Sequence, residues 1–180
     1  MYNRMSRKAA REMAFHAIYE YSFNARRLAD ICTQKTDYET GHDLAGFVRA
    51  YKKPLEPQHE QYLKDILENI EQRLPEIDAL IEKYANNWNL GRISRVTMAI
   101  LRLSIFELLY RLDIPPKVSV NEAVDMAKKY DTDEAPQFIN GILASIIANE
   151  AAERMSIYDP TDEDPDDEEE NIDEPETSDE

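Results

Sequence analysis

Residues 94–147 read SRVTMAILRLSIFELLYRLDIPPKVSVNEAVDMAKKYDTDEAPQFINGILASII, and this stretch decides the fold class. Apolar side chains point nearly all round the helix expected over 93–112, and a helix of that kind is buried on every side. Pro115 and Pro116 cannot continue it. Two further helices are expected over 119–130 and 134–153. The pattern predicts a helical core with 93–112 as its central helix.

Two local features predict how the later helices are built. Ser119 is followed three residues on by Glu122, which is the spacing of a capping box and predicts a helix that begins at Ser119. Gly141 lies inside the last expected helix, where glycine costs about 1 kcal/mol relative to alanine. We expect a close contact between helices to be the reason for Gly141.

The rest of the chain supplies four more expected helices. They lie over 6–23, 25–35, 57–73 and 75–88. Pro57 and Pro75 each suit the first turn of a helix, so a break is expected before Pro75. Residues 36–56 are expected to be irregular or only partly helical. Four glycines in 180 residues argue against a β fold. The sequence therefore predicts an all-α fold, a compact bundle of about seven helices.

Charge is distributed unevenly along the chain. Residues 161–180 contain 13 Asp and Glu and no Lys or Arg, whereas residues 1–160 hold 24 acidic and 21 basic residues, a net charge of −3 within the total of −16. The first 27 residues carry six Lys and Arg against two Glu. From Tyr158 on, the composition cannot bury enough apolar surface to fold. We expect one helical domain over 1–157 and a disordered acidic tail over 158–180.

Composition and motifs exclude several classes of function. A single cysteine, Cys32, excludes an internal disulfide framework and a multi-cysteine zinc site, and it fits a reducing cytoplasm. No run approaches the roughly 20 apolar residues of a membrane span, and the basic N-terminus lacks the apolar core of a signal peptide. The chain has no P-loop, no dinucleotide-binding glycine motif and no metal-ligand spacing of histidines. We expect a cytoplasmic protein without cofactor, metal or catalytic site.

The first expected helix carries the functional signal. One of its faces is apolar and packs inward, and the neighbouring face mixes cations with aromatic rings. That second face consists of Arg4, Lys8, Arg11, Phe15 and Tyr19. Cations pair with phosphates and rings stack on unpaired bases, so the face suits single-stranded RNA. Spacing alone leaves a second interpretation open, a solvated row of cations beside rings at the edge of the core. Tyr130 and Phe138, which flank the last loop, could be core residues or could extend an aromatic surface.

Two segments resemble the NusB family of bacterial transcription antitermination factors. RKAAREMAFHAIYE (Arg7–Glu20) resembles the arginine-rich first helix of that family. AILRLSIFELLYRLDIPPKVSVNEAVDMAKKY (Ala99–Tyr130) and FINGIL (Phe138–Leu143) resemble its C-terminal half. The resemblance covers roughly residues 6–150 and is strongest over 92–147.

The resemblance implies a function and partners. It implies an all-helical protein with two packed helical subdomains that pairs with the ribosomal small-subunit protein NusE. The pair would bind the boxA element of nascent single-stranded RNA and join an antitermination complex on RNA polymerase, notably at ribosomal RNA operons. The family is not enzymatic.

The resemblance also assigns residues. Arg7, Lys8 and Arg11 fall on the family's basic RNA-binding cluster and Tyr19 on the tyrosine of its first helix. Tyr130 and Phe138 fall on aromatic positions that the family places near RNA. The chain departs from the family at Ala9, where some members have arginine, and in the last loop, where Asp131 stands at a position at which glycine is common.

Two other functions remain possible at this level. A helical module that binds only proteins would have the same core. A NusB-like accessory domain also occurs in certain ribosomal RNA cytosine methyltransferases, which need a downstream catalytic domain. The acidic tail could compete with RNA for the basic face, or serve as a solubilising or partner-binding segment.

Overall fold

The computed structural model describes residues 6–23, 28, 56–85 and 93–151, and all regular structure in them is helical. The helices are α1 (Arg7–Tyr21), α4 (Pro57–Tyr84), α5 (Arg95–Tyr110), α6 (Pro116–Tyr130) and α7 (Ala135–Glu150). The predicted all-α class is confirmed for these residues. The helix predicted over 25–35 lies outside the described residues apart from Leu28, and the predicted irregular segment and acidic tail lie outside them too.

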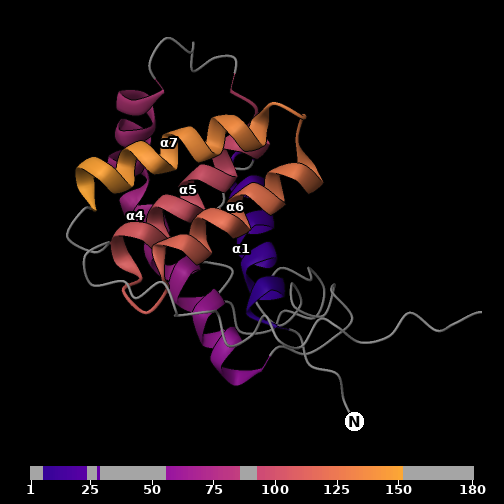
Figure 1. Cartoon of the computed structure of the whole chain (residues 1–180). Helices are drawn as coiled ribbons and strands as arrows, with labels where there is room; N and C mark the ends of the chain where they lie inside the picture. The colour runs from indigo at the N-terminus through magenta and orange to yellow at the C-terminus, as the bar shows by residue number, and fades with distance from the viewer. Residues whose placement is uncertain (1–5, 24–27, 29–55, 86–92, 152–180) are drawn as a thin grey trace, which may run out of the picture.

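Helix α5 is the centre of the fold, as its sequence predicts. It contacts all four other described helices and lies between the pair α1 and α4 and the pair α6 and α7, which crosses in front of them in Figure 1. Ile100, Leu101, Leu103 and Ile105 are fully buried. Ser94 is the N-cap, and its Oγ accepts a hydrogen bond of 2.9 Å from the Thr97 amide.

The predicted break before Pro75 is wrong, because α4 is one helix of 28 residues with Pro75 inside it. Pro75 is exposed, so its ring points away from the core. The buried positions run through it without a change of phase, from Ile70 and Leu74 to Ile77 and Ile81. An interior proline costs about 3 kcal/mol, and burial of each such side chain returns about 1.5–3 kcal/mol. Packing therefore outweighs the local signal.

The predicted capping box at Ser119 is also wrong. Helix α6 begins at Pro116 with Pro115 as N-cap, because the fixed φ of proline suits a first turn. The Ser119 amide already donates to the Pro115 carbonyl at 3.3 Å, and the Ser119 side chain is buried. Glu122 lies instead beside the guanidinium of Arg11, with 3.5 Å between Arg11 Nη1 and a carboxylate oxygen.

The predicted close contact at Gly141 is absent. Gly141 is exposed, and a Cβ built on it would meet no atom within 4 Å. Helix α7 instead packs through Ile139, Leu143 and Ile146, which are fully buried. Within the described part of the chain, no helix is long and apolar enough to cross a membrane.

Candidate functional site

The structure divides the eight predicted site residues into three groups. Arg4 lies outside the described residues. Arg11 and Phe15 are buried. The remaining five are exposed or half-buried, namely Arg7, Lys8, Tyr19, Tyr130 and Phe138.

Arg11 lies inside the core, so its predicted exposed position is wrong. It is 2% exposed, and its Nε donates to a carboxylate oxygen of Glu107 at 2.9 Å. The Tyr62 hydroxyl donates to that same Glu107 oxygen. Burial disfavours the guanidinium charge, but attraction to Glu107 and Tyr62 outweighs it and raises the pKa of Arg11 above its ordinary value. The guanidinium therefore holds α1 against α5.

Phe15 is likewise buried rather than on the predicted exposed face, and it joins α1 to α6. Its ring centroid lies 5.2 Å from that of Tyr130 and 5.1 Å from that of His16. The Tyr130 hydroxyl donates to the Glu12 carboxylate, which also pairs with the Lys129 ammonium. Packing and a hydrogen bond together fix the ring of Tyr130 over the middle of α1.

Glu12 is the acceptor that orients this aromatic cluster. Partial burial raises the pKa of Glu12, but the hydrogen bonds from Lys129 and Tyr130 outweigh burial and leave the pKa below its ordinary value. The carboxylate is therefore charged at neutral pH, and it balances the cation of Lys129 beside the ring of Tyr130.

The start of α1 carries two cations, Arg7 and Lys8. Lys8 is exposed and Arg7 is half-buried. No acidic residue lies in the first turn, and Ser6 makes no side-chain cap, so the positive end of the helix dipole lies beside these cations. A hollow of about 300 Å³ separates this end of α1 from α6 and is lined by cations and carboxylates alike, Lys8, Lys129, Glu12, Glu122 and Asp125 among them.

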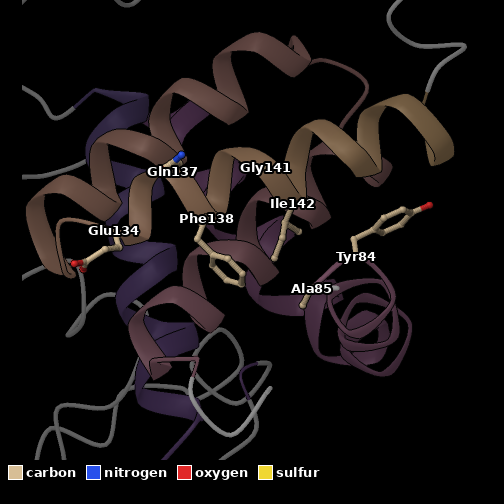
Figure 2. A pocket seen from close by; sticks show the side chains of 7 residues that line it. All are labelled: Tyr84, Ala85, Glu134, Gln137, Phe138, Gly141 and Ile142. Carbon is tan, nitrogen blue, oxygen red and sulfur yellow. The ribbon is translucent and has the colours of Figure 1, made fainter. Parts of the chain in front are cut away.

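Phe138 lies in different surroundings from Tyr130. It lines a groove of about 460 Å³ between α7 and the end of α4. Figure 2 shows Phe138 and Ile142 pointing from α7 toward Ala85, with Tyr84 at one end of the groove and Glu134 at the other. Tyr130 packs on α1 instead, so the predicted pair of rings is divided between two faces of the fold.

Two residues absent from the predicted site lie at the far end of α1. Phe23 is 55% exposed, and the guanidinium carbon of Arg95 lies 4.2 Å from its ring centroid. The Tyr19 ring meets Phe23 nearly edge-on at 5.0 Å. Phe15, Tyr19 and Phe23 are spaced four residues apart, so extending the predicted row by one step would have found Phe23.

Asp131 explains one departure from the family pattern. Its carboxylate accepts a hydrogen bond of 2.6 Å from Ser94 Oγ and another from the Thr97 hydroxyl, so it ties the loop after α6 to the start of α5. Its φ of −127° is extended, and this position therefore does not require glycine. Among the described residues no group of three potential metal ligands occurs.

The chain is similar in sequence and in structure to known NusB proteins. Residues 8–148 match the model of the NusB family. The transcription antitermination protein NusB of Ruminiclostridium cellulolyticum is 35% identical over 152 residues, which cover 84% of this chain and 95% of that relative. A solved structure of T. maritima NusB has a TM-score of 0.68 and 28% identity, covering 85% of this chain and 99% of the other. A solved structure of NusB and NusE in complex with dsRNA has a TM-score of 0.63 and 25% identity, covering 79% and 96%.

Proposed function

The chain belongs to the NusB family, and on that premise we propose that it is a transcription antitermination factor that binds RNA together with NusE. The RNA is a boxA-type element with unpaired bases, and the complex acts on RNA polymerase, notably at ribosomal RNA operons. The observation that carries this proposal is the similarity, over 79% of the chain, to a NusB that was solved with NusE and dsRNA.

The geometry of α1 gives the proposal its physical form. Arg7 and Lys8 lie at the positive end of the helix, and Tyr19 lies near its other end. A helix of 15 residues is about 22 Å long at 1.5 Å per residue, which is room for several nucleotides. Phosphates pair with the cations, and unpaired bases stack on exposed parts of the rings.

Arg11 and Phe15 act beneath that face and not on it. The Arg11–Glu107 pair fixes α1 on α5, and Phe15 supports the ring of Tyr130. Arg4 adds a cation ahead of the helix, and Phe138 offers a second aromatic contact at the groove beside α4. The proposed RNA contacts are therefore Arg4, Arg7, Lys8, Tyr19, Tyr130 and Phe138.

The test titrates the double variant Arg7→Ala/Lys8→Ala into a labelled single-stranded boxA RNA at several salt concentrations. Fluorescence anisotropy of the RNA measures binding. Loss of two phosphate contacts should weaken binding and lower the slope of log K against log salt by about 1.4, at roughly 0.7 per phosphate for single strands. The matched control is Lys64→Ala/Arg73→Ala, which removes two exposed cations from α4. Equal effects of the two double variants would remove α1 from the interface.

The RNA titration, together with binding measurements for NusE and S-adenosylmethionine, separates the competing functions. Binding of NusE by a chain that binds no RNA, with or without NusE, would identify a helical module for proteins alone. Binding of S-adenosylmethionine would instead favour an accessory domain of a methyltransferase.

A further inference from the structure

We infer that Phe23 and Arg95 form a stacking platform for one unpaired RNA base at the end of α1. The inference rests on the proposed RNA-binding function and adds a binding site to it. The first observation is that the Phe23 side chain is exposed to solvent. Among the described residues, Phe23 and Leu112 are the large apolar side chains that are exposed.

The two side chains already form a layered pair. The guanidinium carbon of Arg95 lies 4.2 Å from the centroid of the Phe23 ring, which is a close cation–π contact. Arg95 Nη1 also donates to the Ser22 carbonyl at 3.4 Å. The Phe23 ring is 55% exposed with this guanidinium in place, so part of the ring remains open to a base, and bases in unpaired RNA stack on rings as well as on guanidinium planes.

The charge of Arg95 is not matched by a carboxylate within the described residues. Other arginines there are paired, as Arg102 is with Asp78 and Arg111 with Asp113, both at 2.8 Å. Arg95 is exposed, and its hydrogen bond goes to a neutral carbonyl. Among these residues its cation has no anionic partner, and a phosphate beside the stacked base would supply one.

The platform is fixed by the elements around it. The Tyr19 ring meets Phe23 at 5.0 Å with 69° between the planes, which restricts the Phe23 ring from one side. Asp131 holds Ser94, the residue before Arg95, through a hydrogen bond of 2.6 Å. The end of α1, the start of α5 and the loop after Tyr130 thus converge here, and a preformed site lowers the entropy cost of binding.

Continuity with α1 favours RNA over protein as the occupant. Phe15, Tyr19 and Phe23 form one row of rings along a helix whose other end carries Arg7 and Lys8. Phe15 is buried, so a single strand that follows the cations would reach the half-buried Tyr19 and then the exposed Phe23 with its cation. An isolated aromatic–arginine pair would serve a protein partner equally well, so the experiment includes that outcome.

The experiment uses the full chain with the labelled boxA RNA, with and without saturating NusE. Phe23→Leu keeps apolar volume and removes the ring, and it should weaken RNA binding about tenfold with an unchanged salt slope, since stacking of one base contributes about 1–3 kcal/mol. Arg95→Gln should weaken binding and lower the slope by about 0.7. Arg95→Lys should keep the slope but lose affinity. Leu112→Gln, at the opposite end of α5, is the control and should bind as wild type.

A series of boxA RNAs, each with one abasic nucleotide, tests stacking directly. One position should weaken wild-type binding about tenfold and leave Phe23→Leu unaffected, because the ring and the base contribute one shared interaction. If every position weakens both proteins equally, or if Phe23→Leu binds RNA as Leu112→Gln does, the platform is wrong. A variant that loses NusE binding but keeps its RNA affinity would reassign the patch to the protein partner.

The outcome also distinguishes the two proposals. Wild-type protein that binds no RNA would overturn both the function and the platform. Wild-type binding that Arg7→Ala/Lys8→Ala weakens and Phe23→Leu leaves unchanged would overturn the platform alone.

Discussion

Arg11 shows how one long-range contact decides the role of a residue. It belongs by spacing to a basic face, yet its partner Glu107 lies 96 residues away and fully buried on α5. Neither the helical period nor the family resemblance reports that partner. Lys8, three residues earlier, has the same charge and is exposed. The sequence could predict that the helix is basic, but only the packing of α1 on α5 divides its cations between core and surface.

We predict that Arg11→Ala destabilises the fold by about 3–5 kcal/mol, because it leaves the buried Glu107 carboxylate without its cation. Urea unfolding should show a lower midpoint with a similar slope. The double variant Arg11→Met/Glu107→Leu should recover much of the loss, since neither charge remains in the core. A midpoint of Arg11→Ala equal to that of wild type would contradict the structural role.

The environment of His16, again a single residue, predicts that the stability of the fold depends on pH. Burial lowers the pKa of His16 below its ordinary value, and Lys129 adds to this effect against the carboxylates of Glu12 and Glu20. The folded state therefore favours the neutral ring, and stability is lost as pH falls through the unfolded pKa toward the folded one. The urea midpoint should fall from pH 7 to pH 5, and by less in His16→Gln. Parallel curves for the two proteins would refute the assignment.

At the scale of elements, the apolar period was the reliable guide. It correctly predicts α5 as the buried centre, and the predicted ends of α1, α5, α6 and α7 lie within three residues of the observed ones. The errors concern where helices begin and end. Pro75 and the Ser119–Glu122 spacing are local signals that are each compatible with more than one helix boundary, and tertiary packing decides which boundary forms. The groove beside Phe138 and the platform at Phe23 depend on which helices pack against each other. The apolar periodicity of a sequence does not determine that.

Pro75 gives the prediction for α4. Pro75→Ala restores an amide hydrogen for the Glu71 carbonyl in a helix that is already continuous, and it should stabilise the protein by about 1–2 kcal/mol after the smaller gain in freedom of the unfolded chain. Pro57→Ala, at the first turn, is the matched control and should change little. Thermal unfolding of both variants measures the difference. A lower melting temperature for Pro75→Ala would show that the proline is required for the course of α4.

At the scale of the whole molecule, the distribution of charge and the helical fold class are the features that the sequence predicts best. A basic start and an acidic end could be predicted from the sequence, and so could the helical class, because both depend on composition and period. The family followed from specific motifs. The proposed RNA interface did not follow as completely, since Arg11 and Phe15 are buried and the proposed platform adds Phe23 and Arg95.

The measurement that tests the account most directly is the affinity of the full chain for single-stranded boxA RNA with and without saturating NusE. We predict tighter RNA binding in the presence of NusE and, by linkage, tighter NusE binding in the presence of RNA. Arg7→Ala/Lys8→Ala should lose RNA affinity in both conditions and retain NusE. RNA binding that is absent in both conditions, while NusE still binds, would contradict the account.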